Sequence, residues 1–173
     1  MGHTSSYYLG VLAGIMVGLV VVIISRRAKN KGMKCEYDER QVIARGKAFK
    51  YGLFSLIGYL VLYGIIQDMT GIYWGKGLVG TALGICISVA VFAVVSIWND
   101  AYFSLWENPK RYITIFLAAF ALNLLPAVRV IMHRDQEMDY GYINLFLSVT
   151  LLIVLVVMGL KFQKDRRERD EEV

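Results

Sequence analysis

The sequence predicts an all-α protein, a polytopic transmembrane helical bundle with five spans. Hydrophobic residues make up 57% of the 173 residues and charged residues only 19%, too few to cover a water-soluble domain of this length. The apolar residues also gather into five runs without Asp, Glu, Lys or Arg. A helix needs roughly 20 apolar residues to cross the hydrocarbon core of a membrane. We therefore expect a single membrane domain, 1–173, with spans at about 7–25, 51–67, 77–98, 112–128 and 143–160.

The first run, 7–25, is expected to be a retained helix. A signal peptide carries basic residues before its apolar run, whereas here Arg26 and Arg27 follow it. Three glycines recur at every fourth position, a spacing that lets helix backbones approach closely in lipid. This face is expected either to pack inside the bundle or to form a contact between two copies of the chain. Its glycines are Gly10, Gly14 and Gly18.

A basic segment, RRAKNKGMK at 26–34, follows the first run. It holds five basic residues and no acidic one. Near an anionic leaflet each such charge contributes about 1 kcal/mol of attraction. We expect this segment to lie against anionic lipid headgroups.

The second span is preceded by a charged stretch, DERQVIARGKAFK at 38–50. Asp38 and Gln41 have the spacing of a capping box, so a helix is expected to begin here and to continue into the membrane. The stretch has two interpretations: a capped and anchored helix start, or a docking surface for another protein or a lipid headgroup. The candidate docking residues are Asp38, Glu39, Arg40, Arg45, Lys47 and, from the next polar segment, Asp100.

The third span repeats the small-residue spacing of the first. Gly80, Gly84 and Ser88 recur at every fourth position of the sequence. Close approach of helices is the expected role of such a face, because lipid offers no hydrophobic drive for helix association. We predict that these residues mark a helix-packing surface.

The polar segment 99–111 connects the third and fourth spans. Pro109 is expected at the first position of the next helix, where its missing N–H costs little. The aromatic residues between Asp100 and Trp106 are expected to rest on the membrane surface. The carboxylate of Asp100 is expected to meet a basic residue of the 38–50 stretch, namely Arg40, Arg45 or Lys47.

The fourth span contains one amide and one proline. Asn123 needs a hydrogen-bond partner in hydrocarbon, and Pro126 three residues later frees a carbonyl in the preceding turn. Asn123 is expected to satisfy this defect or to bond to a neighbouring helix. The alternative is that it lines a cavity for a neutral or cationic ligand. Spans two and four are the shortest, and both are expected to gain a turn from flanking helix.

The fifth span is followed by the tail KFQKDRRERDEEV, which holds five basic and five acidic residues. Opposite charges four residues apart predict a helical extension of the span. The tail is neutral as a whole, so it does not indicate nucleic-acid binding. The spaced pairs are Lys161–Asp165, Lys164–Glu168 and Arg167–Glu171.

Basic residues distribute unevenly between the two sides of these spans. Segments 26–50, 99–111 and 161–173 carry nine, two and five Lys or Arg, whereas the other side carries three. Basic loops stay in the cytoplasm. The sequence therefore predicts an N-terminus outside and a cytoplasmic C-terminus.

Two stretches carry a resemblance to known proteins. DERQ at 38–41 followed by ARGKAFKYG at 44–52, together with IWNDAYFSLWENPKRYI at 97–113, resembles small multi-pass membrane proteins of Gram-positive bacteria. No activity is assigned to that group. The resemblance implies a bacterial plasma membrane and nothing about catalysis.

Chemistry-bearing patterns are scarce in the sequence. The spans contain no carboxylate, histidine or basic residue of the kind that relays protons or ions. His133 lies in an acidic loop that either binds a cation loosely or is simply solvated. We expect no catalytic residues, no metal site and no cofactor, and a non-enzymatic interaction or regulatory protein that docks a partner on its cytoplasmic face. The alternative is a small permease subunit or an oligomeric pore for a small solute.

Overall fold

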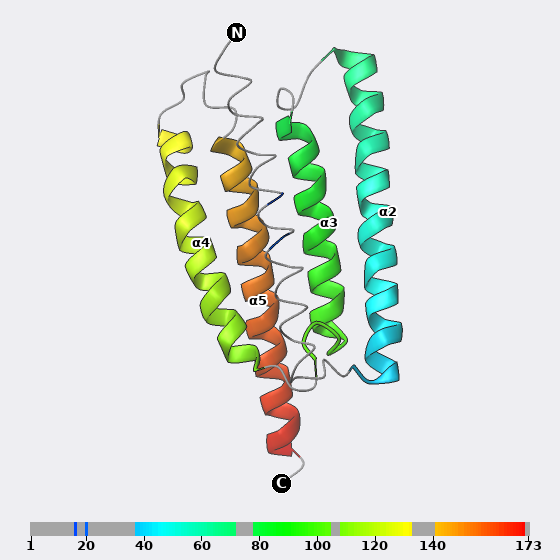
Figure 1. Cartoon of the computed structure of the whole chain (residues 1–173), viewed down its shortest axis with the longest axis vertical. Coiled ribbons are helices and arrows are strands. Elements are labelled where there is room, and N and C mark those ends of the chain that lie inside the picture. The colour runs from blue at the N-terminus through cyan, green and yellow to red at the C-terminus, as the bar shows by residue number, and fades with distance from the viewer. Residues whose placement is uncertain are drawn as a thin grey trace. The chain divides into compact units, whose positions relative to one another are not determined.

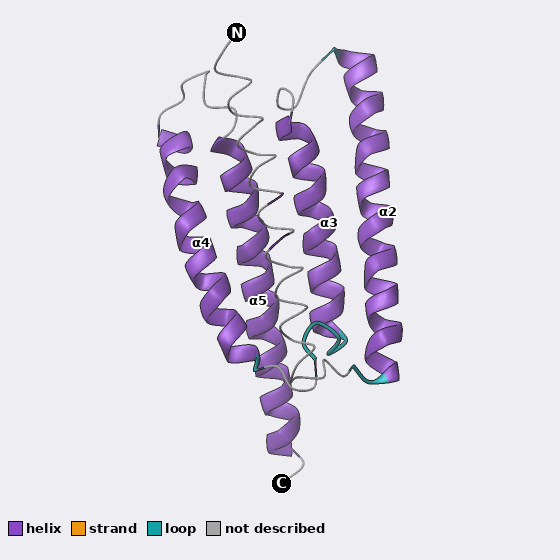
Figure 2. Ribbon diagram, viewed as in Figure 1, coloured by secondary structure: helices purple, strands orange, loops and turns teal. Residues whose placement is uncertain are grey.

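A computed structural model describes residues 37–71, 78–104, 108–132 and 141–171, together with Met16 and Val20. These residues form four helices, α2 (Glu39–Thr70), α3 (Leu78–Trp98), α4 (Pro109–Met132) and α5 (Gly141–Glu171) (Figure 1). No strand occurs among them (Figure 2). All four helices are long and apolar enough to cross a membrane, which is compatible with a membrane protein. The all-α prediction is confirmed for this part of the chain.

The helices coincide with four of the five predicted spans. As predicted, α2 and α4 are longer than their apolar runs, and α4 begins at Pro109. The charged tail extends α5 to Glu171. The first predicted span, 7–25, with Gly10, Gly14 and Gly18, lies outside the described residues except for Met16 and Val20, as does the basic segment 26–34.

The four helices lie in a row. Helix α3 packs against α2 on one side and against α5 on the other, and α5 packs against α4 (Figure 1). Successive helices run in opposite directions (Figure 1). As a result, one end of the bundle along the helix axes is formed by the start of α2, the end of α3, the start of α4 and the end of α5 (Figure 1).

The contact between α2 and α3 depends on small residues. A Cβ atom on Gly80 would meet the ring of Tyr63, and one on Gly84 would meet the ring of Tyr59. Further along, Gly52 of α2 lies so close to α3 that a Cβ atom would be 3.2 Å from the backbone oxygen of Ser88. The predicted packing face of α3 is thus the face that α2 covers.

Hydrogen bonds accompany this close packing. The Tyr59 hydroxyl donates to the carbonyl of Gly80 at 2.8 Å, and the Ser88 hydroxyl donates to the carbonyl of Gly52 at 2.8 Å. Ser55 donates to the same Gly52 carbonyl at 2.8 Å. Both interhelical bonds end on the backbone of glycines, where the missing side chain lets the neighbouring helix approach closely.

The contact between α3 and α5 forms the small apolar core. Its buried members are Ala93 and Ile97 of α3 and Val154 and Met158 of α5. The residues after α3 fold onto this core. Ala101 and Ser104 are buried, and the rings of Tyr102, Phe103, Tyr112 and Phe116 pack against one another.

The described part of the aromatic stretch after Asp100 packs against the bundle, and its expected position at the membrane surface stays a prediction. Tyr102 and Phe103 are partly buried against the core cluster. Their rings meet the start of α4, which removes apolar surface from solvent.

The two outer helices keep most of their surface exposed. In the most apolar stretch of each helix, only 6% of the residues are buried in α2 and 6% in α4, compared with 28% in α3. Large apolar side chains such as Leu62, at 61% exposure, and Leu125, at 74%, point away from the described residues. Lipid accommodates such faces without cost, whereas water does not.

Candidate interaction surface

The start of α2 is built as the sequence predicts. Asp38 has an extended backbone, and its N–H donates to Oε1 of Gln41 at 3.3 Å. This is one half of a capping box, so the predicted cap is confirmed. The cap fixes where the charged stretch turns into helix.

The same glutamine also ties α2 to the end of α3. Nε2 of Gln41 donates to the carbonyl of Asp100 at 2.6 Å and to that of Phe103 at 3.4 Å. The oxygen of the Gln41 amide thus accepts a hydrogen bond in the cap, and its nitrogen donates to the segment that follows α3. The capping pattern predicts only the first of these two roles.

The turn after α3 has the geometry of a Schellman motif. The N–H of Ala101 donates to the carbonyl of Ser96 at 2.8 Å, and the N–H of Asp100 to that of Ile97 at 3.1 Å. Asp100 occupies the left-handed position with φ 54°, where glycine is more usual. The dipeptide Asn99-Asp100 directly after an apolar run is the sequence signal for this turn, because short polar side chains tolerate the conformation.

The carboxylate of Asp100 pairs with the end of the last helix. Lys161 Nζ lies 2.9 Å from Asp100 Oδ2 and 3.1 Å from Asp165 Oδ1. The lysine side chain is only 15% exposed, whereas that of Asp100 is 64% exposed. Burial alone would lower the pKa of Lys161, but its hydrogen bonds and attraction to the two carboxylates outweigh this effect and raise the pKa.

The prediction that Asp100 meets Arg40, Arg45 or Lys47 is wrong. Within the part of the chain that the structure describes, no ion pair joins it to any of them. The reason is the order of the helices, since α5 is the other neighbour of α3 and its Lys161 reaches the turn. Arg45 instead lies over the ring of Tyr37 at 4.3 Å from the ring centroid.

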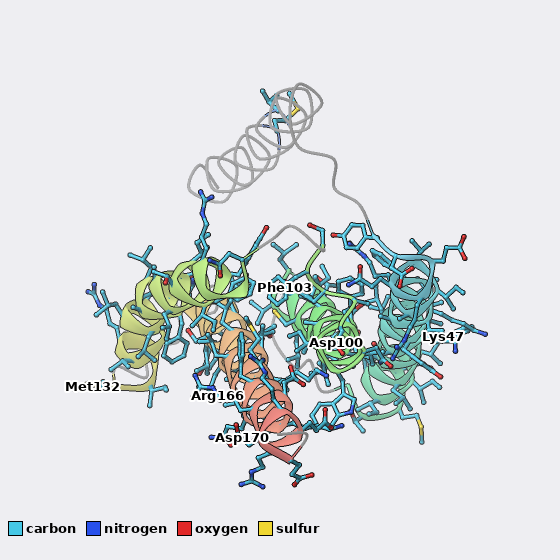
Figure 3. All side chains as sticks on the ribbon, turned by 90° about the horizontal axis from the view of Figure 1, so that it is seen from below. Lys47, Asp100, Phe103, Met132, Arg166 and Asp170 are labelled. Carbon is cyan, nitrogen blue, oxygen red and sulfur yellow. The ribbon has the colours of Figure 1, made fainter. Side chains whose placement is uncertain are left out.

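A cavity of about 280 Å³ lies where these segments meet. Polar groups line one part of it and the apolar core the other. Figure 3 looks onto this end and shows Asp100 and Phe103 there, with Arg166 and Asp170 further along α5. The lining residues are Gln41, Ile97, Asp100, Tyr102, Phe103, Ser104, Met158, Lys161, Phe162 and Asp165.

Two basic residues of α2 line a different hollow. A groove of about 570 Å³ lies between the start of α2 and the end of α3. Arg40 and Lys47 line it, and both are exposed. The remaining lining residues are Glu39, Ile43, Ala44, Tyr51, Val95 and Asn99.

The extension of α5 carries part of the predicted charge pairing. The Lys164–Glu168 pair forms at 3.6 Å, in addition to Lys161–Asp165. Lys164 also lies 5.6 Å from the centroid of the Trp98 ring. The third spaced pair, Arg167–Glu171, forms no ion pair among the residues described.

The Asn123 amide donates within its own helix. Its Nδ2 donates to the carbonyl of Ala119 at 2.8 Å, one turn earlier in α4. The carbonyl freed by Pro126 belongs to Leu122, so Asn123 does not fill that particular defect. The loop that contains His133 lies outside the described residues, and within them no group of three His, Cys, Asp or Glu is placed to hold a metal ion.

No protein-family model matches the chain, and neither a curated protein nor a solved structure matches it significantly.

Proposed function

We propose that the protein is a non-enzymatic integral membrane protein that docks a partner protein on its cytoplasmic face and acts as an interaction or regulatory module. It crosses a bacterial plasma membrane five times, with its N-terminus outside and its C-terminus inside. The docking surface consists of the start of α2, the turn after α3 and the extension of α5.

One observation carries this proposal: three polar segments that are far apart in the sequence are joined at the same end of the bundle. Gln41 reaches the backbone of Asp100, 59 positions away, and Lys161 reaches its carboxylate, 61 positions away. A surface assembled from three segments has a defined shape, whereas separate loops do not. Such preorganisation lowers the entropic cost of binding a partner.

The distribution of charge supports the orientation. The described basic residues at this end come from α2, α4 and α5, whereas the opposite end has Arg129 in the last turn of α4. A cytoplasmic location of this end follows from the preference of basic segments for that side. The helical extension of α5 is exposed and charged, as expected for a part that faces cytosolic proteins.

A photo-crosslinking amino acid incorporated at Arg166 in native membranes tests the docking proposal. We expect one protein to crosslink there and to be lost when Arg45→Glu reverses a charge on α2, because both segments belong to one surface. Leu62 on the exposed apolar face of α2 provides the matched control position, which should label only lipid. The Arg45→Glu variant must retain its thermal stability for the loss to count.

Other outcomes would reject this function. Crosslinks only to further copies of the chain would indicate a homo-oligomer. Solute flux into liposomes that depends on Asn123 would favour the permease or pore. Labelling of a cysteine at position 166 by an impermeant reagent from outside intact cells would overturn the orientation.

A further inference from the structure

The groove between the start of α2 and the end of α3 has a charge pattern that the polar cluster at Asp100 lacks. Lys161 is held between two carboxylates, and Arg45 lies over an aromatic ring. Arg40 and Lys47 line the groove without an ion pair among the described residues. Two unpaired cations in one hollow indicate a site for an anion.

We propose that this groove binds the headgroup of an anionic phospholipid that carries a phosphodiester and free hydroxyls, of the phosphatidylglycerol type. The proposal rests on the membrane insertion proposed above but not on the docking of a partner protein. Arg40 and Lys47 are seven residues apart on α2, which is about 10 Å along the helix axis. Positions seven residues apart lie on the same face of a helix, and both side chains line this groove.

The position of the groove along α2 matches the depth of lipid headgroups. Lys47 and Tyr51 are near the point where the charged stretch gives way to the apolar run. Beyond it, Leu53 is 57% and Phe54 58% exposed, so an acyl chain has an apolar helix surface to lie along. Tyrosine at this depth keeps its ring in an apolar layer and its hydroxyl in a polar one.

The remaining polar groups suit hydroxyls better than a second phosphate. Asn99 uses its Nδ2 to donate to the carbonyl of Val95 at 2.7 Å, so its Oδ1 is the atom that can accept a hydrogen bond from a ligand. Glu39 is the first residue of α2 and lies at the end of the groove farther from the apolar run. A carboxylate there repels phosphate but accepts hydrogen bonds from hydroxyls, as a glycerol headgroup provides them.

The test uses the full-length protein, purified in a mild detergent and delipidated. Native mass spectrometry then measures the binding of phosphatidylglycerol and of phosphatidylcholine with the same acyl chains. We expect phosphatidylglycerol to bind about tenfold more tightly or better, since two charges contribute. The double variant Arg40→Gln/Lys47→Gln should lose this preference. The matched control Arg166→Gln/Arg167→Gln removes two charges from α5 and should retain it.

Three results would overturn the proposal. An unchanged preference in the Arg40/Lys47 variant would remove the groove from lipid binding. An equal loss in the α5 control would reduce the effect to net charge. Binding of soluble glycerol 3-phosphate as tightly as the lipid would make the ligand a free phosphate ester. Thermal melting of each variant in the same detergent verifies its fold, and the crosslinking at Arg166 remains an independent test of partner docking.

Discussion

Helix α2 is held to its neighbours in two different ways along its length. In the apolar part, Tyr59 and Tyr63 lie on the small residues of α3, and the backbones approach at Gly52. At the polar end, α2 reaches the turn after α3 through the Gln41 amide, and Asp100 of the same turn forms its ion pair with Lys161 of α5. The first set is closely packed and shielded by the helices, whereas in the second Asp100 is 64% exposed.

This difference separates stability from recognition. Packing in lipid permits one geometry, because an added carbon has no space, and its hydrogen bonds have no water to compete with them. Exposed polar contacts are weak and exchange readily with water or with a partner. We therefore expect substitutions in the apolar contact to change the stability of the fold and those at the polar end to change what binds there.

The largest effect is expected from Gly84→Leu. The new side chain would overlap the ring of Tyr59, so α2 and α3 would have to separate. We expect the free energy of unfolding to fall by about 3 kcal/mol, measured by thermal or denaturant unfolding in detergent. Gly64→Leu is the matched control, because nothing lies within 4 Å of a Cβ atom there. Equal effects of the two substitutions would contradict this contact.

Tyr59→Phe tests the hydrogen bond in the same contact. The substitution keeps the ring over Gly84 but removes the donor to the carbonyl of Gly80. A loss of about 1 kcal/mol is expected, the usual magnitude of a bond between membrane helices. Tyr142→Phe, in a tyrosine that is 39% exposed on α5, should be neutral. A neutral Tyr59→Phe would show that the bond contributes nothing.

The apolar contact was more accessible to sequence reasoning than the polar end. Span positions follow from the length of each apolar run, and the spacing of Gly80, Gly84 and Ser88 marks a packing face whatever covers it. Which side chains cover that face depends on the register of α2 against α3. That register is set by both helices together, so Tyr59 and Tyr63 carry no local signal for it.

At the polar end, local patterns predicted local structure only. The capping box at Asp38 and the start of α4 at Pro109 depend on a few adjacent residues, and both are confirmed. The partner of Asp100 depends on which helix lies beside α3. The order of the helices in the sequence does not say whether a residue of α2 or of α5 reaches the turn after α3. The predicted partners from α2 are therefore wrong, and Lys161 of α5 pairs with Asp100.

Gln41→Ala is expected to loosen the polar end with a smaller cost in stability. It removes the donor to the carbonyls of Asp100 and Phe103 and half of the cap. We expect a loss of about 0.7 kcal/mol in the free energy of unfolding, since the site is partly solvated. Faster hydrogen exchange should appear at the amides of the turn, such as Ala101. Exchange confined to the first turn of α2 would mean that Gln41 acts only as a cap.

The smallest effect on stability is expected from Lys161→Gln, about 0.3 kcal/mol near neutral pH, because one partner of the ion pair is well exposed. The sign of its pH dependence follows from the raised pKa of Lys161. A lysine whose pKa is higher in the folded protein stabilises it below the unfolded value of 10.5, and this contribution disappears as the pH rises through the folded value. The difference between wild type and variant should therefore stay constant from about pH 7 to 9 and vanish only at higher pH. A difference that already disappears below pH 9 would show that burial, and not the pairing with Asp100 and Asp165, dominates at this lysine.

Loss of the crosslink at Arg166 in a variant of such nearly unchanged stability would then assign the Asp100–Lys161 pair to partner recognition.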